Sequence, residues 1–280
     1  GSPALVPSAP PVLHNQRLGL VQIKDGVDLD QRFLFYLLLS DECRRQLRAT
    51  ATGSTVRHTA PSRIYEVRVR VPPLHVQQII GRVLGGLDDL IENNRRRVEV
   101  LEEMAKAIYR EWFVHFRYPG HEDATFVDSP LGPIPEGWAW VPLVEEAKIT
   151  MGQSPKSEFY NSDGVGTPFH QGVTDFGTHY PTHRKYCTVE GRAAFEGDVL
   201  VSVRAPVGRV NLADTTLVIG RGLAAVRSLR GRQSLLSAQL KEVFAEEDSM
   251  GGGTIFKAIG KKELEQVPVL RIPDQLASQA

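Results

Sequence analysis

The stretch LHVQQIIGRVLGGLDDLIENNRRRVEVLEEMAKAIYREWFVHFR, residues 74–117, decides the fold of this chain. It contains no proline. Pro72-Pro73 precede it and Tyr118-Pro119-Gly120 follow it, and these are signals for the start and the end of a helix. The stretch therefore predicts one long helix. With a rise of roughly 1.5 Å per residue, such a helix is a rod of about 60 Å.

Apolar residues recur along this predicted helix in alternating steps of four and three, the pattern of a coiled-coil seam. The seam consists of Val76, Ile80, Val83, Leu87, Leu90, Asn94, Leu101, Met104 and Ile108. Because an apolar stripe of this length cannot bury itself, the helix needs a second helix, from this chain or from another. The polar Asn94 either fixes the register of that pair or is exposed to solvent.

One sequence plan occurs on both sides of the predicted helix. It consists of an apolar helix-like segment, a Gly-x-Thr unit, the alternating apolar residues of a strand, and a proline. The two copies comprise Phe33–Leu47, Gly53–Thr55, Val67–Val71 and Pro72, and then Leu235–Phe244, Gly252–Thr254, Val267–Ile272 and Pro273. We interpret them as the ends of two similar domains.

The second of these domains has the sequence pattern of mixed helices and strands. Strands are expected at Trp138–Val141, Val199–Val203, Arg209–Leu212 and Leu217–Ile219, and a helix at Ser234–Glu246. The fold class is therefore α+β, with globular domains attached to a long coiled-coil-forming helix. The expected divisions are a disordered leader at 1–16, the C-terminal part of a first domain at 17–73, the helix at 74–117, a complete second domain at 118–273 and a tail at 274–280.

The formal net charge of the chain is zero, but its basic residues are unevenly distributed. Residues 184–232 contain nine basic and four acidic residues. Such a segment either faces a polyanion or forms a solvated surface with compensating acids nearby.

Residue types with special chemistry are sparse. Cys43 and Cys187 lie far apart, which predicts neither a disulfide framework nor a zinc site and fits a reducing cytosol. No apolar run approaches the ~18–20 residues that cross a membrane. There is no G-x-G-x-x-G turn, no P-loop and no Asn/Asp-Pro-Pro-aromatic motif, and the histidines lack paired metal spacing. We expect a chain that catalyses nothing and itself binds no metal and no cofactor.

The order of the motifs resembles that of the specificity subunit of type I restriction–modification systems. The shared features are a strand that ends in Pro-Pro-Leu, the run Gln77-Gln78-Ile79-Ile80, the long helix, and a Gly152-x-Ser154-Pro155 loop between the two Gly-x-Thr units. The string PLGPIPEGWAWVPL, residues 130–143, is the most specific match. The resemblance extends from about Leu18 to Pro273.

The resemblance implies a DNA-reading subunit without catalytic activity. Each globular unit would be a target-recognition domain that reads one half of a bipartite sequence in double-stranded DNA. The long helix would be a spacer that pairs antiparallel and docks methyltransferase subunits, which carry S-adenosylmethionine. A separate restriction and translocase subunit would use ATP and Mg²⁺. The alternative function is a structural coiled-coil adaptor that binds protein.

A full-length member of that family has two complete recognition domains and two spacers. Here the first domain would lack its front, and the tail at 274–280 would be the start of a truncated second spacer. We therefore expect either a fragment or a chain that self-associates through Val76–Ile108.

Candidate DNA contacts are chosen by residue type, because Arg and Lys read guanine, Gln reads adenine, and cations, hydroxyls and loop amides hold phosphate. The candidates are Gln153, Ser154, Lys156, Gln171, Thr174, Arg184, Lys185, Arg204, Arg209, Thr254 and Lys257. Ordinary solvated turns are the competing interpretation, and for the loop at 252–254 a packed structural turn is favoured. The aromatic residues Trp112, Phe113, Phe116 and Tyr118 are expected to form a hydrophobic joint rather than a platform for bases.

Overall fold

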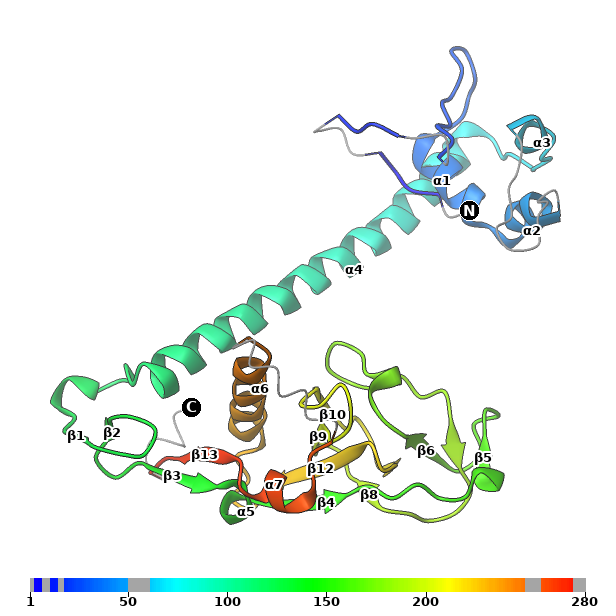
Figure 1. Ribbon diagram of the computed structural model, residues 1–280. Coiled ribbons are helices and arrows are strands. Elements are labelled where there is room, and N and C mark those ends of the chain that lie inside the picture. Colours follow the sequence, from blue (N-terminus) through cyan, green and yellow to red (C-terminus); the bar gives the residue numbers. More distant parts are fainter. Residues whose placement is uncertain (1–2, 7–10, 15–17, 50–60, 250–257, 274–280) are drawn as a thin grey trace. The chain divides into compact units, whose positions relative to one another are not determined.

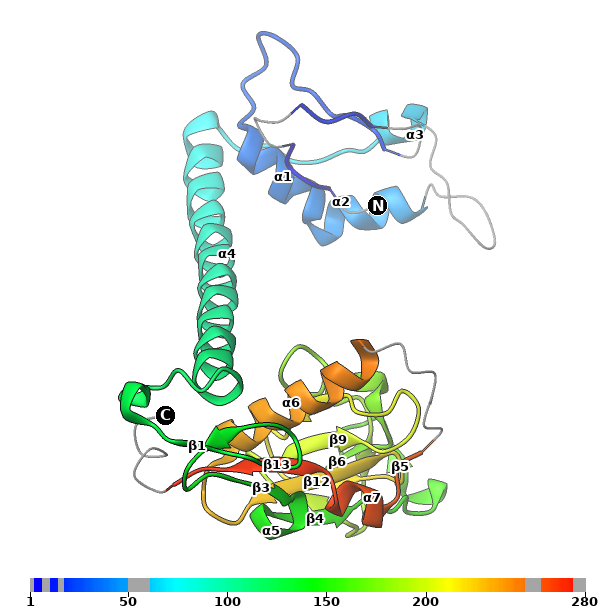
Figure 2. The ribbon, with the colours of Figure 1, turned by 60° about the vertical axis from the view of Figure 1, so that its left-hand side comes forward.

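The computed structural model describes residues 3–6, 11–14, 18–49, 61–249 and 258–273 (Figures 1 and 2). It divides into two units, Gly1–Glu103 and Met104–Ala280. The mixture of a long helix with several sheets confirms the α+β fold class.

The regular secondary structure of the first unit, where it is described, consists of helices. Its helices are α1 (Gln31–Leu39), α2 (Asp41–Ala49), α3 (Pro61–Tyr65) and the start of α4 (Leu74–Tyr109). The segment Phe33–Leu47, expected to be one helix, is divided at Ser40, whose backbone is extended. The Ser40 hydroxyl donates to the carbonyl of Leu37 and accepts from the backbone N–H of Cys43. Ser40 thus satisfies backbone groups at the end of one helix and at the start of the next.

The long helix begins at Leu74, as the sequence predicts, and ends earlier than Arg117. A π-helical turn, η1 (Arg110–Val114), follows α4 directly. Phe116 then adopts a left-handed backbone conformation with φ of 56°, which no α-helix can continue through. The helical conformation therefore stops at Val114.

A small and polar face of α4, rather than its apolar seam, contacts the first unit. Gln77, Gly81 and Gly85 are the buried residues of the helix, and their spacing of four places them on one face. The Gln77 side chain accepts from the N–H of Asp30 and donates to the carbonyls of Asp28 and Pro72. A Cβ atom at Gly81 would lie 2.8 Å from the Asp30 carboxylate, so the close approach requires glycine.

The apolar seam is left open by the part of the chain that the structure describes. The exposed fractions of Leu87, Leu90 and Leu101 are 53%, 54% and 62%. Val83, Met104 and Ile108 are also exposed, as is Asn94, whereas Val76 and Ile80 are half-buried. A helix with such a stripe still lacks the partner that its pattern requires.

The run Val67–Val71 is not a strand, which corrects one element of the repeated plan. No strand within the described residues pairs with it. Instead, the side-chain amide of Gln46 hydrogen-bonds both the N–H and the carbonyl of Arg68. The Gln46 amide therefore occupies one edge of this extended segment.

The second unit is built on an antiparallel sheet in the order β10-β9-β12-β4. Its strands are β4 (Ala147–Met151), β9 (Val199–Ser202), β10 (Val210–Leu212) and β12 (Leu223–Ser228). Val199 and Val201 face a core formed with α6 (Gln233–Ser249) and α7 (Lys261–Glu265). Leu200 belongs to a second core on the other face. Burial on both faces explains why this strand is apolar without alternation.

A second sheet, in the order β5-β7-β6-β11-β8, supplies the other core. Its strands are β5 (Tyr160–Asn161), β6 (Thr167–His170), β7 (Tyr186–Cys187), β8 (Ala193–Ala194) and β11 (Leu217–Ile219). Only β6 and β11 run parallel, with Phe169 opposite Val218 and His170 opposite Ile219. The carboxyl ends of these two strands therefore lie side by side.

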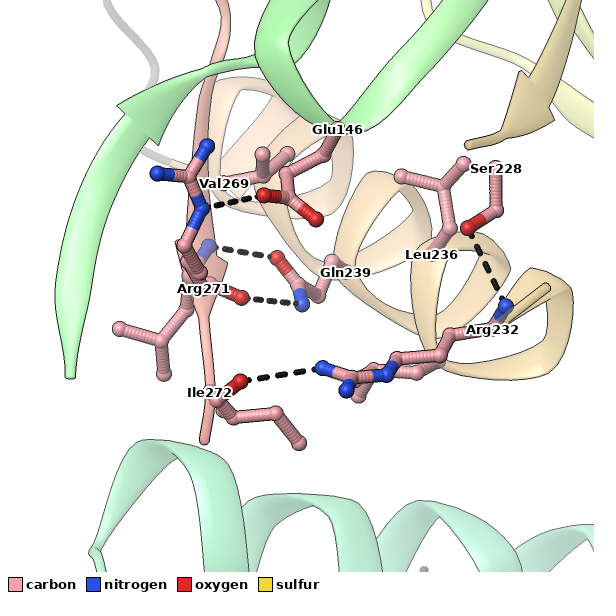
Figure 3. Close-up of a pocket in the computed structure, with 10 residues that line it drawn as sticks. Glu146, Ser228, Arg232, Leu236, Gln239, Val269, Arg271 and Ile272 are labelled. Atoms are coloured by element: carbon pink, nitrogen blue, oxygen red, sulfur yellow. Dashed lines mark hydrogen bonds and ion pairs between the residues drawn. The ribbon is translucent and has the colours of Figure 1, made fainter. Parts of the chain in front are cut away.

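Helix α6 is fastened to β13 (Pro268–Arg271), which pairs antiparallel with β3 (Ala139–Pro142). Figure 3 shows the fastening: the Gln239 amide hydrogen-bonds the N–H and the carbonyl of Leu270, and Arg232 donates to the carbonyl of Ile272. The gap between these groups holds about 20 Å³, roughly one water molecule, so it is a packing gap. Gln46 makes the same pair of bonds to a single backbone residue, Arg68, in the first unit.

The aromatic residues after α4 form a hydrophobic joint, as expected. Phe113 is buried in one cluster with Trp138 and Ile272, and Trp112, Phe116 and Tyr118 pack against that cluster. Tyr118 stacks on Trp138 with ring centroids 5.3 Å apart, so these rings contact each other rather than being open to bases.

The remaining short elements are η2 (His121–Asp123), β1 (Phe126–Val127), β2 (Ile134–Pro135), α5 (Leu143–Glu146), η3 (Ser157–Phe159) and η4 (Val173–Asp175).

We expect Gln239→Ala to lower the free energy of unfolding of the second unit by about 2–4 kcal/mol, because two buried backbone groups of Leu270 lose their partner. The control Lys241→Ala, at an exposed position of the same helix, should stay within about 0.5 kcal/mol. All three tryptophans lie in the second unit, so tryptophan fluorescence during urea unfolding measures this unit. Equal midpoints for the two variants would contradict the role given to Gln239.

Candidate nucleic-acid interface

Three loops meet where the parallel strands β6 and β11 end. The N–H of Gly220 donates to the carbonyl of His170, and the N–H of Gly222 donates to the carbonyl of Gln171. The loop after β4 joins them, because the N–H of Gln153 donates to the carbonyl of Ile219. Backbone hydrogen bonds therefore hold the loops at 152–157, 171–175 and 220–222 together.

Glycine is required at the points where these loops touch. A Cβ atom at Gly152 would lie 2.2 Å from the carbonyl oxygen of Gly220. A Cβ atom at Gly222 would lie 2.4 Å from the carbonyl oxygen of Gln171. Both distances are far below van der Waals contact with backbone atoms, so only glycine permits this packing. The loops are close-packed supports rather than loose turns.

A side-chain network links the three loops. The Ser154 hydroxyl donates to Oε1 of Gln171 at 2.8 Å. The same hydroxyl oxygen accepts from the backbone N–H of Arg221 at 3.2 Å. Gln171 and Arg221 are exposed, whereas Ser154 is half-buried between them.

A shallow groove of about 240 Å³ opens beside this network. Three of the residues predicted to contact DNA, Gln171, Thr174 and Arg204, line it together, and all three are exposed. Gly172, Val173, Ala205 and Gly222 complete its wall. An amide, a hydroxyl and a guanidinium around one concavity can donate to base edges and to phosphate.

The other predicted contacts lie around the groove or outside the described residues. Lys156 lies 4.0 Å from the carboxylate of Glu158. Arg184 forms an ion pair of 3.3 Å with Asp175, directly after Thr174 in the chain. Gln153, Lys185 and Arg209 are exposed, but none of them lines the groove. Thr254 and Lys257 fall in a segment that the structure does not describe.

Arg221 is the residue that the sequence analysis missed as a candidate. It lies at the tip between Gly220 and Gly222, beside Ser154. The only signal in the sequence is a cation between two glycines. This signal points to the site only once the pairing of β6 with β11 is known. Three other arginines of the basic segment have structural contacts: Arg227 with Asp198, Arg230 with Glu146, and Arg232 with the carbonyl of Ile272. The interpretation as a solvated surface with compensating acids nearby therefore holds for Arg227 and Arg230.

His170, the residue before Gln171, begins a hydrogen-bonded chain of two histidines and a carboxylate. His170, which is 1% exposed, has its Nε2 atom 3.0 Å from Nδ1 of His183, and Nε2 of His183 lies 3.2 Å from the Asp214 carboxylate. The carboxylate selects the Nε2–H tautomer of His183, so His170 donates to His183 through its own Nε2–H. Burial, followed by the nearby charge of His183, lowers the pKa of His170 from 6.5 to about 4. His170 is therefore neutral near pH 7, with its one N–H at the Nε2 atom that faces His183.

Other reactive groups within the described ranges are few. Cys43 and Cys187 are free and buried. No group of three or more His, Cys, Asp or Glu side chains in these ranges is arranged to hold a metal ion. Nor do these ranges contain a helix whose length and apolar character would let it cross a membrane.

The chain is similar in sequence to proteins described as type I restriction enzyme specificity subunits. Residues 5–103 match the family model of the "Type I restriction modification DNA specificity domain", a match that begins within the expected leader at 1–16. The chain is 33% identical over 263 residues to a Methanocaldococcus jannaschii protein named as the MjaX type I restriction enzyme specificity subunit. That alignment covers 92% of this chain and 61% of the relative. The MjaIX specificity subunit of the same organism is 32% identical over 54% of this chain and 34% of its own length.

The fold has a counterpart among solved structures. The type I restriction–modification S subunit from M. genitalium superposes with a TM-score of 0.59 at 14% identity, over 90% of this chain and 64% of that chain. At this identity the likeness concerns the fold. The chain spans about three fifths of the length of its MjaX relative.

We expect the second unit to lose stability as the pH falls from about 6.5 to about 4. In this window His170 binds a proton in the unfolded chain but stays neutral in the folded one. His170 therefore lowers the free energy of unfolding by about 2 kcal/mol at pH 5 relative to pH 7.5. His170→Gln, which keeps a donor towards His183 but does not titrate, should lose about 2 kcal/mol less over the same interval. Urea unfolding followed by tryptophan fluorescence at both pH values measures the difference. If both proteins lose the same stability, His170 is not the group responsible.

Proposed function

We propose that this chain, which belongs to the family of type I restriction–modification specificity subunits, binds double-stranded DNA in a sequence-specific manner through the groove lined by Gln171, Thr174 and Arg204. The observation that carries the proposal is one concave surface lined together by an exposed amide, hydroxyl and guanidinium, next to three loops that hydrogen-bond to one another. Residues that touch a base edge must be positioned by a rigid support, and the glycine-packed loops provide one.

The groove combines the two kinds of contact that specific DNA binding needs. Cations and hydroxyls on phosphates supply most of the affinity, and side chains on base edges supply the specificity. Arg204 lines the groove with Gln171, and the backbone N–H of Arg221 donates to the Ser154 hydroxyl, which bonds to Gln171. We assign phosphate contacts to these two arginines and base contacts to the Gln171 amide.

We further propose that the chain acts as a non-catalytic subunit. Methyltransferase subunits would bring S-adenosylmethionine, and a restriction and translocase subunit would use ATP and Mg²⁺. Family membership supports this division of labour, and so does a sequence without nucleotide-binding or methyltransferase motifs. The second unit would read one half of a bipartite target.

The apolar seam of α4 is the surface we assign to association with another helix. Its leucines are more than half exposed within the described structure and recur with coiled-coil spacing. A second copy of this chain offers the same seam, so a C₂ pair would bury both and present two DNA-binding units. A structural adaptor that binds only protein would use the same seam without needing the groove.

DNA binding by the groove should depend steeply on salt. We expect the slope of log K against log [salt] to fall in magnitude by roughly 0.9 for each of Arg204→Ala and Arg221→Ala if each contacts one phosphate. Lys262→Ala, which removes an exposed cation from α7, is the matched control and should leave the slope unchanged. Fluorescence anisotropy with labelled duplexes at several salt concentrations measures this. If the chain binds no duplex, either alone or with its methyltransferase subunits, the result supports the structural adaptor instead.

Self-association should depend on the seam of α4. Leu87→Asp places a carboxylate where two apolar stripes meet, and burying an unpaired charge is costly. We therefore expect the dissociation constant of the dimer to rise by at least roughly ten-fold. Lys106→Asp introduces the same carboxylate at an exposed position outside the seam and should leave the dimer intact. Sedimentation equilibrium gives both dissociation constants. A wild-type chain that stays monomeric at all concentrations contradicts the seam assignment.

A further inference from the structure

We infer that Gln171 reads a single adenine and that Ser154 is a positioning residue that sets which way its amide faces. The inference rests on the proposed function, since it assigns a base to one residue of the same groove. It is carried by the hydrogen bonds of the Ser154 hydroxyl, which constrain the Gln171 amide before any DNA is bound.

The Ser154 hydroxyl has one proton and two lone pairs. A backbone N–H can only donate, so the Arg221 N–H occupies a lone pair of the Ser154 oxygen. The hydroxyl proton then needs an acceptor, and Oε1 of Gln171 lies 2.8 Å away. If the amide were turned over, its NH₂ group would face the hydroxyl, and the Ser154 proton would lose this acceptor. The network therefore selects the orientation with Oε1 towards Ser154 and Nε2 away from it.

The backbone that bears this amide is equally constrained. The carbonyl of Gln171 accepts from Gly222, and the preceding carbonyl accepts from Gly220. A Cβ atom at Gly220 would lie 2.9 Å from the Cα atom of Gln171, so the neighbouring strand end packs directly against the residue. The side chain itself remains exposed and lines the groove. The backbone and the side-chain oxygen of Gln171 are thus fixed, while the residue stays exposed to the groove.

The amide that results matches the edge of adenine. In the major groove adenine presents the N7 acceptor beside the N6 amino donor, and glutamine pairs with both at once. Nε2 of Gln171 would donate to N7, and the second lone pair of Oε1 would accept from N6 while the first accepts from Ser154. Guanine presents two acceptors and cytosine a single donor, so neither satisfies both amide groups. An amide turned over would exchange its donor and acceptor and lose the match.

Selection from a random duplex pool tests this with the full chain, alone and with its methyltransferase subunits. The variants are Gln171→Ala, Ser154→Ala and Ser154→Thr, which keeps the hydroxyl, with Ser157→Ala as a control that removes an exposed hydroxyl near the same loop. We expect the wild-type chain to prefer adenine at one position by roughly ten-fold. Gln171→Ala should reduce this preference to below about two-fold, and Ser154→Ala should reduce it at the same position only. Ser154→Thr and Ser157→Ala should keep it.

The outcomes separate this inference from the proposed function. A wild-type chain that enriches no sequence overturns both. A wild-type chain with a defined target, whose preference at every position survives Gln171→Ala, overturns the inference and leaves sequence-specific binding in place. Loss of preference at all positions in Ser154→Ala, with Ser154→Thr failing to restore it, shows that Ser154 supports the loops generally and overturns its positioning role. Tryptophan-detected unfolding midpoints of each variant confirm that the second unit is folded.

Discussion

The parallel pairing of β6 with β11 is the constraint on which the site depends. It places His170 opposite Ile219, so the residues that follow, Gln171 and Gly220, leave the sheet at the same edge. The backbone bonds of Gly220 and Gly222 to this strand end continue the pairing beyond the sheet. A slip of one residue would turn the side chains of β6 to the opposite face and separate the loops. The groove is therefore a consequence of strand register.

The sequence predicts the parts of the molecule that repeat locally. The start of α4 and the aromatic joint follow from chain-break signals and helical spacing, and β9 follows from the apolar run at 199–203. Gln171, Thr174 and Arg204 were chosen by residue type, and the fold brings them to one groove. Arg221 and the histidine chain could not be found in this way, because each depends on segments paired far apart in the sequence.

Helix α4 shows the same limit on a smaller scale. Its apolar period identifies a seam that needs a partner, and hydrophobicity alone makes that stripe the obvious contact surface. The contact within the first unit instead uses Gln77 and Gly81, one for its three hydrogen bonds and the other for its missing side chain. Neither property has a periodic signal. A long helix can therefore be anchored by one face and still offer its apolar face to another helix.

The division between backbone and side chain explains how such a site can change its target without losing its fold. The loops are held by backbone hydrogen bonds and by glycines that permit close approach, and these contacts are indifferent to the side chains that line the groove. Thr174 and Arg204 are exposed, so their replacement leaves both cores untouched. Ser154 differs, because its half-buried hydroxyl links the backbone of one loop to the side chain of another. A change of target at Gln171 should therefore be accompanied by a change at Ser154, whereas changes at Thr174 and Arg204 can occur independently.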